Sequence, residues 1–471
     1  MGVKFGPLGS SIRKFRQAQV HLHRRFSMRV HTQLAGLLVF ALIAPILASA
    51  ATTNATVTFN NVPLTTAQGS SEPSISIGSD GTMAIDALGW LFPFGTQLWT
   101  GHYGSTPTLR GAVDSAIQKA NAVEFGGGDA DVSISSDGTL HLTTLVILIN
   151  KPFRAAQIAV SAINCGQASS ANITCAAQIV DLAGNDRPWI TTDGSIIYIS
   201  YHDAKNSSLI RVQRSENSGV SWTRVGDPVV GQGATTGSST FNNIAGPIVA
   251  DSASHAVYDV YAAGQTGITK AKTTDFRKVF VSRSFDFGKS WTAALVYSGP
   301  AGTTNGNVFP VVATDPVTHA VYASWSDGSN TFFSASTDNG ATWSPAVIVN
   351  IAPATTAIFP WIAAYNGTVD VVYYGTSSSS NTNTASWNVY FAQTTNNGAS
   401  FIQSVVDSTA NHTGVICTQG TACAPGTRNL LDLFEVAIDP PTGKAAIVYV
   451  NDLLTTDAGG NRLPQTVLAQ Q

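Results

Sequence analysis

Charged residues are scarce in this chain of 471 residues, where Asp, Glu, Lys and Arg together make up 11%. Methionine occurs three times, and the only glutamates are Glu72, Glu124, Glu216 and Glu435. Helices favour Glu, Lys, Leu and Ala, whereas this chain is rich in Gly, Ser, Thr and Asn. The shortage of glutamate and lysine, with the abundance of Gly, Ser, Thr and Asn, argues against a helical protein and favours strands joined by many tight turns.

Long apolar runs are also missing, except from Leu34 to Leu47. That run follows seven basic residues and no acidic one, and it leads into Ala48-Ser49-Ala50. This order is typical of a secretory signal peptide cleaved after Ala50, with Met28 as an alternative start. A retained membrane anchor is the competing interpretation, since the run and its flanks approach about 18 residues. We expect a signal peptide at residues 1–50 and one secreted, extracellular domain at residues 51–471.

Positive charge is in short supply beyond residue 50, where 18 basic residues stand against 28 acidic ones. Nucleic acids and anionic membrane surfaces attract basic proteins. The charge balance therefore argues against both as partners. With no other long apolar run, we expect no membrane span after cleavage of the signal peptide.

Cysteine is limited to two close pairs, Cys165 with Cys175 and Cys417 with Cys423. In an exported chain, pairing within each couple is the favoured one of three connectivities. A zinc site is the alternative, but neither couple has a CxxC spacing or a neighbouring histidine. We expect two local disulfides.

One unit recurs seven times: a β-rich run, a turn of Gly, Asp, Asn or Pro, and a second β-rich run. Its copies begin 50 to 76 residues apart and align on Ile75, Val132, Pro188, Pro247, Pro310, Pro360 and Val436. Such turn chemistry between β-rich runs predicts hairpins.

A second pattern, Ser/Thr-x-Asp/Asn-x-Gly followed by an aromatic residue, alternates with these hairpins. It is clearest at 284–291 and 336–343, with looser copies at 215–222 and 394–401. We call it the boxed turn. Since it lies between two further β-like runs, each unit has four strands, A to D. Four-stranded units repeated in this way predict an all-β fold, a β-propeller.

Both ends of the chain predict how the ring closes. The segment 465–470 resembles a third strand with nothing behind it, and Ala55–Asn61 is a strand without a unit. Pairing the two would complete the last blade and cover two sheet edges. We expect seven blades; six is the alternative, because the first unit has no clear boxed turn.

The boxed turn resembles the Asp box, or BNR repeat, of the sialidase-like (neuraminidase) superfamily of secreted propellers. With the hairpins, the resemblance covers nearly the whole chain after residue 50. It implies that the boxed turns lie on the face opposite an active site. The residues agree with a structural role, because Asp286 can accept backbone N–H groups and Gly288 can take a positive φ.

The opposite face would be built from the residues before each strand A and from the B–C loops. These residues form a polar, net-acidic channel mouth, where a ligand pocket is the default expectation. Solvation or mutual pairing of these charges is the alternative for any one of them. The candidates are Glu72, Asp129, Asp131, Asp186, Arg187, Asn243, Asn307, Asp432, Glu435, His202, Asp203, Asp327, Tyr374 and Asp452.

The resemblance also implies a chemistry. Sialidases use an arginine cluster, a tyrosine nucleophile activated by a glutamate, and an aspartate acid/base. The Arg-Ile-Pro motif expected before the first boxed turn is absent, and Arg187-Pro188 is a partial match. The catalytic candidates are Asp131, Arg187, Glu435, Asp203, Tyr374 and Arg428. Asp129 and Asp131 are candidates for a structural calcium site.

The predicted function is that of a secreted, exo-glycosidase-type hydrolase acting on an extracellular carbohydrate or glycoconjugate at the channel mouth. The alternative is a non-catalytic propeller that binds glycan or protein outside the cell. We expect a monomer that requires no cofactor, with calcium as a structural option.

Overall fold

The computed structural model describes residues 48–91, 95–114, 123–150, 155–182, 185–203, 209–229, 243–263, 276–424 and 426–471. The predicted signal peptide lies outside these residues, apart from its last three positions. In the described part of the chain, no helix has the length and apolar composition needed to cross a bilayer.

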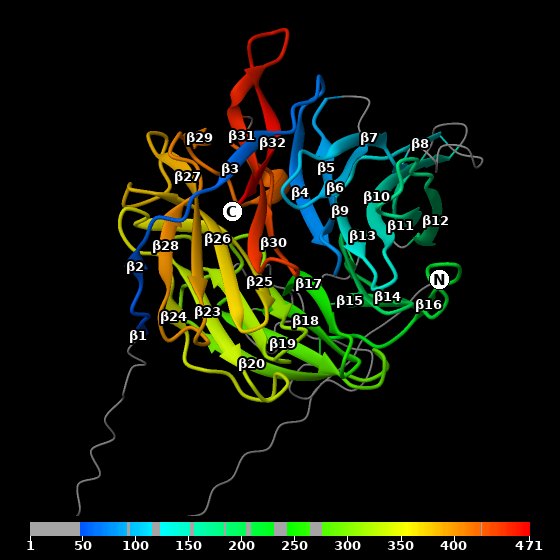
Figure 1. Cartoon of the computed structure of the whole chain (residues 1–471), viewed down its shortest axis with the longest axis horizontal. Helices are drawn as coiled ribbons and strands as arrows, with labels where there is room; N and C mark the ends of the chain where they lie inside the picture. The colour runs from blue at the N-terminus through cyan, green and yellow to red at the C-terminus, as the bar shows by residue number, and fades with distance from the viewer. Residues whose placement is uncertain are drawn as a thin grey trace, which may run out of the picture. The chain divides into compact units, whose positions relative to one another are not determined.

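Seven four-stranded blades follow one another around a ring, so the chain is a seven-bladed β-propeller, as predicted (Figure 1). Blades 1 to 3 are β4 (Ser70–Ile77), β5 (Thr82–Gly89), β6 (Thr96–His102), β7 (Thr108–Ala112); β9 (Ala130–Ile134), β10 (Thr139–Asn150), β11 (Ala155–Gln167), β12 (Ala176–Asp181); and β13 (Asn185–Asp193), β14 (Ile196–Asp203), β15 (Ile210–Ser215), β16 (Thr223–Arg224). A short strand, β8 (Val123–Phe125), also pairs with β10.

Blades 4 to 6 repeat the same antiparallel order of strands. They are β17 (Asn243–Asp251), β18 (Ala256–Ala263), β19 (Lys278–Ser284), β20 (Thr292–Ser298); β21 (Val311–Thr314), β22 (Val321–Ser326), β23 (Thr331–Ser336), β24 (Val347–Ile348); and β25 (Thr356–Tyr365), β26 (Thr368–Thr376), β27 (Ser386–Thr394), β28 (Ile402–Val405). After blade 6 come β29 (His412–Thr413), which pairs with β27, and a 3-10 turn, η2 (Gly420–Ala422).

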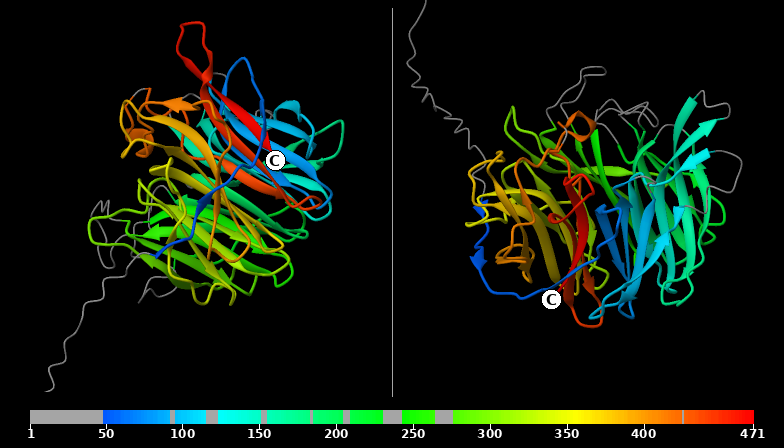
Figure 2. Two further views of the ribbon diagram at one scale, coloured as in Figure 1. Left: turned by 60° about the vertical axis from the view of Figure 1, so that its left-hand side comes forward. Right: turned by 90° about the horizontal axis from the view of Figure 1, so that it is seen from above.

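Blade 7 closes the ring with a strand from the other end of the chain, as predicted. It consists of β30 (Glu435–Asp439), β31 (Lys444–Thr456), β32 (Arg462–Gln470) and β3 (Asn60–Pro63). Asn60 pairs with Gln470 and Pro63 with Val467, so the pairing begins later than the expected Ala55. Figure 2 shows the red C-terminal strands beside the blue N-terminal ones.

The residues before β3 also pair with the outer strands of neighbouring blades. β1 (Ala48–Ser49) pairs in parallel with β24 of blade 5, and β2 (Thr53–Asn54) pairs in parallel with β28 of blade 6. One segment thus covers the outer edges of three consecutive blades, where unpaired backbone groups would otherwise face solvent. The predicted cleavage after Ala50 would remove β1 and leave β2 and β3.

The inner strands of several blades begin with a β-bulge immediately before a proline. Glu72, Arg187 and Phe359 have φ values of 49°, 40° and 56°, and the strand register shifts at each of them. A bulge breaks the side-chain alternation of a strand and re-aims the residue at that point. Glu72 and Arg187 are thereby brought together, as described below.

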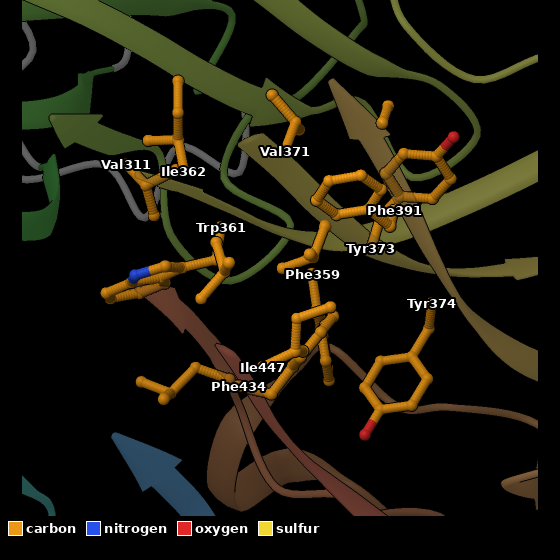
Figure 3. Close-up of a cluster of buried hydrophobic side chains, with 14 of the residues drawn as sticks. Val311, Phe359, Trp361, Ile362, Val371, Tyr373, Tyr374, Phe391, Phe434 and Ile447 are labelled. Atoms are coloured by element: carbon orange, nitrogen blue, oxygen red, sulfur yellow. The ribbon is translucent and has the colours of Figure 1, made fainter. Parts of the chain in front are cut away.

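Aromatic side chains fill the space between neighbouring blades. Figure 3 shows this packing between blades 6 and 7, where the Tyr374 ring lies 4.6 Å from Phe434 and 6.2 Å from Phe359. Phe359, Tyr374 and Phe434 are all buried. The interlocking aromatic surface supplies much of the apolar burial that stabilises the ring.

The boxed turns lie on the same face as the A–B turns, because the rings of His255 and Phe287 are 5.6 Å apart. Asp286 accepts the amide of Ser290 at 2.8 Å and the hydroxyls of Ser284 and Ser290 at 2.8 and 2.6 Å. The carboxylate is thus bound by donors of its own turn. Asp286 holds this turn, and the predicted structural role fits the observed contacts.

The boxed turns also connect consecutive blades. Arg214 of blade 3 donates to the carbonyl oxygen of Phe287 in blade 4 at 2.6 Å. Arg283 of blade 4 repeats the contact with Asn339 in blade 5 at 3.1 Å. Both predicted disulfides, Cys165–Cys175 and Cys417–Cys423, are present.

Candidate functional site

A cavity of about 650 Å³ lies on the face opposite the boxed turns. Its walls come mainly from the starts of blades 3 and 4, from residues 304–309 before blade 5, and from residues 418–420 and 432 before blade 7. We call it the mouth pocket. Among the described lining residues the charged ones are Asp186 and Asp432, and Phe276 and Phe309 add aromatic surface.

Arg187 and Glu72 form a buried ion pair beside this pocket. Their side chains are 3% and 2% exposed, and Arg187 Nη1 lies 3.0 Å from Glu72 Oε2. The Arg187 guanidinium also lies over the Trp189 ring, at 4.3 Å, and 5.6 Å from the ring of Phe309. Because Phe309 lines the pocket, Arg187 supports the pocket wall from behind.

Negative charge accumulates around this pair. Burial, and then the charge of Asp129, raise the pKa of Glu72 well above its usual range, while Arg187 opposes the rise. Asp129 Oδ1 is 3.9 Å from Arg187 Nη1. Glu72 Oε1 also accepts the backbone amide of Asp432 at 2.9 Å. Blades 1 and 3 and the connection to blade 7 are joined through one carboxylate.

Asp186 and Asp432 differ in their surroundings although they line the same pocket. Burial and the nearby charge of Asp129 raise the pKa of Asp186, and we expect water to weaken this rise because the residue is exposed at the pocket wall. Asp432 is 17% exposed and bound to Arg428, whose Nε donates to Oδ1 at 3.3 Å. Burial raises the pKa of Asp432, and Arg428 opposes this.

The predicted candidates Asp131 and Glu435 are buried and do not line the mouth pocket. Asp131 accepts the amides of Val132 and Ile190, both at 2.8 Å, and so links blades 2 and 3. Glu435 Oε2 accepts the amide of Ile75 at 3.0 Å and links blades 7 and 1. Burial raises the pKa of Asp131 to about 7 and that of Glu435 well above its usual range.

Asp129 and Asp131 do not assemble the oxygen ligands that calcium needs. Both Asp131 oxygens accept main-chain amides, and Asp129 lies beside Arg187. Calcium takes six to eight oxygen ligands. Among the described residues, no three His, Cys, Asp or Glu side chains gather as metal ligands. The observed contacts do not fit a calcium site at these two residues.

Asp203 and Tyr374 belong to separate networks. Asp203 accepts a hydrogen bond from Arg211 Nε at 2.8 Å. The Tyr374 hydroxyl donates to the Val450 carbonyl oxygen and accepts the Val450 amide, both at 2.9 Å. Burial raises the pKa of Tyr374 above its usual value. Neither residue lines the pocket, and the tyrosine oxygen is held between blades 6 and 7.

Sequence reasoning placed Asp186 and Asp432 at the mouth without selecting them as catalytic. It chose Asp131 and Glu435 because they begin inner strands, but these strands turn the two carboxylates toward neighbouring blades. The pocket wall at residues 418–420 was not predicted at all. The one available signal was its position between two cysteines.

No protein-family model and no curated protein matches this sequence. Solved structures similar to it include an ulvan lyase of polysaccharide lyase family PL25 bound to -[GlcA(1-4)Rha3S]-, with a TM-score of 0.48 and 10% identity over 87% of this chain and 94% of that one. An α-L-arabinanase of Penicillium chrysogenum complexed with arabinobiose gives 0.46 and 11%, over 68% and 94%. The intramolecular trans-sialidase of Ruminococcus gnavus gives 0.40 and 11%, over 85% and 94%.

Proposed function

We propose that this chain is an extracellular, exo-glycosidase-type hydrolase whose site is the mouth pocket. The observation that carries the proposal is that Asp186 and Asp432, from blade 3 and from the connection to blade 7, line one cavity. Most glycosidases act through two carboxyl groups beside the scissile bond. The two disulfides support the location, because disulfides are typical of exported proteins.

The different surroundings of the two carboxyl groups suggest different roles. Asp186, with its raised pKa, is suited to donate a proton to the oxygen of the leaving group. Asp432 is paired with Arg428, which opposes the rise that burial causes in its pKa, so it is the better suited of the two to ionise, as the base or nucleophile. Arg428 then acts through Asp432, and Arg187 through Phe309 and Glu72, so both arginines are positioning residues.

The other four residues predicted to be catalytic have structural roles in this proposal. Asp131 and Glu435 hold neighbouring blades together around the channel. Asp203 and Tyr374 stabilise blades 3 and 6, and the proposed reaction uses neither. The proposal routes no step through calcium or another cofactor.

A panel of fluorogenic aryl glycosides, neutral and acidic, tests the proposal on the full chain. Asp186→Asn and Asp432→Asn should each lower kcat by about 100-fold or more, the usual scale for loss of acid–base catalysis. Asp286→Asn is the matched control, because the boxed turns of blades 3 and 6 carry Asn217 and Asn396 at that position. Undiminished turnover in both pocket variants would remove the assignment. Glycan binding without turnover would favour a non-catalytic propeller.

A further inference from the structure

One wall of the mouth pocket is a loop that a disulfide closes. Thr418, Gln419 and Gly420 line the cavity, and Cys417 and Cys423 are bonded on either side of them. The loop belongs to the connection between β29 and β30, which also carries Asp432. The wall and one proposed catalytic carboxylate therefore lie on the same connection.

Backbone hydrogen bonds within the loop and at its base hold it together. The amide of Cys423 donates to the Gly420 carbonyl oxygen at 3.2 Å, and that of Ala422 donates to Gln419 at 3.1 Å. At the base, the Cys417 amide donates to the carbonyl oxygen of Thr427 at 2.9 Å. A wall fixed in this way loses little conformational freedom when a ligand binds.

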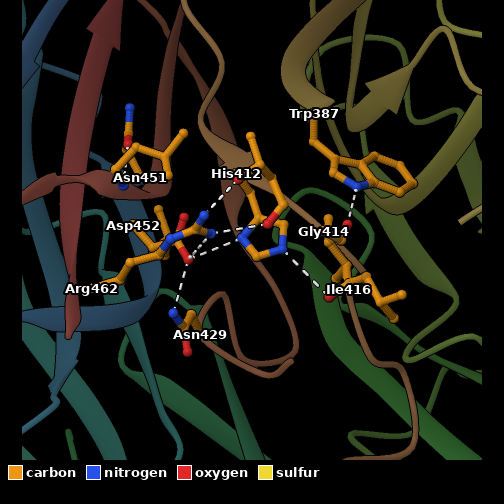
Figure 4. A network of polar contacts seen from close by, with 12 residues as sticks. Trp387, His412, Gly414, Ile416, Asn429, Asn451, Asp452 and Arg462 are labelled. Carbon is orange, nitrogen blue, oxygen red and sulfur yellow. Dashed lines mark hydrogen bonds and ion pairs between the residues drawn. The ribbon is translucent and has the colours of Figure 1, made fainter. Parts of the chain in front are cut away.

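The connection is tied to blade 7 on both sides of the loop, as Figure 4 shows. His412, before the loop, places Nδ1 3.0 Å from Asp452 Oδ2, and Asn429, after it, donates to the same oxygen at 2.9 Å. Arg462 Nη1 is 3.6 Å from that oxygen as well. Asp452 is fully buried, so this attachment is shielded from water. We call it the Asp452 clamp.

The pocket lining indicates which class of ligand it would take. Thr304, Asn307, Thr418 and Gln419 provide uncharged hydrogen-bonding groups beside two phenylalanine rings. Sugar hydroxyls bind such groups, and the apolar side of a sugar ring suits aromatic surface. Among the lining residues that the structure describes, the charged groups are both carboxylates. An acidic sugar would therefore meet like charge, which disfavours its binding.

We infer that the loop Cys417–Cys423 is the specificity wall of the mouth pocket. Thr418 and Gln419 bind hydroxyl groups of an uncharged sugar unit, and the disulfide and the Asp452 clamp keep them in position. The inference rests on the proposed function for its ligand class. Its residues differ from the proposed catalytic pair, so the two can fail separately.

The test compares two disulfide variants of the full chain. Cys417→Ser/Cys423→Ser removes the disulfide that closes the loop, and we call it the freed-wall variant. Cys165→Ser/Cys175→Ser is the matched control, since its disulfide also closes a short loop but lies outside the pocket. The probes are neutral oligosaccharides and, alongside them, uronic- and sialic-acid oligosaccharides, with binding measured by calorimetry. A neutral aryl glycoside gives KM and kcat separately.

We expect the freed wall to raise KM by about 5- to 20-fold and to leave kcat within about twofold, because lost preorganisation weakens binding. Gln419→Ala should weaken neutral-sugar binding by about 3- to 10-fold, the scale of one hydrogen bond. The control should match the unaltered chain in both quantities. Melting temperatures of all variants separate loss of binding from loss of folding.

Three results would overturn the inference. The first is unchanged KM in the freed-wall variant together with unchanged binding in Gln419→Ala. The second is tighter binding of the acidic oligosaccharides than of the neutral ones, and the third is no binding of any probe by the unaltered chain, which removes the proposed function as well. Neutral-sugar binding without turnover, weakened in Gln419→Ala, supports the inference and removes only the hydrolase.

Discussion

The pKa of an aspartate carboxyl group shifts in opposite directions on the two faces of the propeller. In the boxed turn of blade 5, hydrogen bonds from Thr342 and Ser336 lower the pKa of Asp338. At the mouth and in the channel below it, burial raises the pKa of Asp186, Asp131 and Asp86, the last to about 8. A carboxylate is therefore stabilised on one face and disfavoured on the other.

The difference comes from where the hydrogen-bond donors lie in the chain. A boxed turn brings its donors within four residues of the aspartate, as Ser290 does for Asp286. Asp131, which is buried, accepts one amide from the next residue, Val132, and one from Ile190 of a neighbouring blade. For Asp131 burial outweighs these hydrogen bonds and makes ionisation costly, and groups with raised pKa values are typical of functional sites. The position of an aspartate in the blade, and not the number of aspartates, distinguishes the face with the mouth pocket from the face with the boxed turns.

The largest effect is expected from removing the buried Arg187 beside the mouth pocket. Arg187→Met leaves Glu72 buried without its partner, and we expect a loss of about 3–5 kcal/mol in the free energy of unfolding. Urea unfolding measures it. Adding Glu72→Gln should recover part of the loss, because the second change removes the unpaired charge. A loss below about 1 kcal/mol for Arg187→Met would contradict the role given to this pair.

The pH dependence of stability should have opposite signs on the two faces. Burial raises the pKa of Asp86 to about 8, against about 3.9 for an unfolded aspartate. The folded state then holds a proton that the unfolded state has released, so stability present below about pH 4 is lost as the pH rises toward 8. For Asp338 the folded pKa is lowered, so its stabilisation is present above about pH 4 and is lost as the pH falls.

Urea unfolding between pH 3 and pH 9 checks both signs. Asp86→Asn should flatten the decline between pH 5 and 8, by at most about 1.4 kcal/mol per pH unit. Asp338→Asn should instead flatten the change on the acid side. If Asp86→Asn left the decline in stability between pH 5 and 8 unaltered while Asp338→Asn changed that decline, the assignment of the two faces would be reversed.

The smallest effect concerns the boxed turn itself. Asp286→Ala removes the acceptor of the Ser284 and Ser290 hydrogen bonds, and we expect a cost of about 1 kcal/mol because the group is partly exposed. Asp286→Asn should cost close to nothing, as Asn217 and Asn396 make the equivalent contacts. Thermal unfolding measures both changes, and equal losses for alanine and asparagine would show that the side-chain oxygen is not what holds the turn.

Much of the fold could be predicted because its signals are local. Seven hairpins aligned from Ile75 to Val436 gave the inner strands of seven blades, and the boxed turns gave the opposite face. Two orphan segments gave the closure of blade 7. Turn chemistry and alternation act over a few residues, so a single sequence carries them in full.

The candidate site was harder to predict, since it depends on side-chain direction. Arg187 was predicted at the mouth and lies buried beside the pocket, but its positive φ and the bulge that turns it toward Glu72 have no reliable sequence signal. Asp131 and Asp186 both come close to the start of an inner strand. Only the first is turned toward a neighbouring blade, and only the second lines the pocket.

The sequence by itself determined the repeat, the turn chemistry, the local disulfides and the scarcity of positive charge. Each of these depends on neighbouring residues or on simple composition. The tertiary structure decided which polar groups meet, because closing the ring brings Asp186, Asp432 and the loop Cys417–Cys423 to one cavity from distant parts of the chain. Burial then raises the pKa of Asp186 and of Asp432, since desolvation depends on surroundings that exist only after the blades have packed.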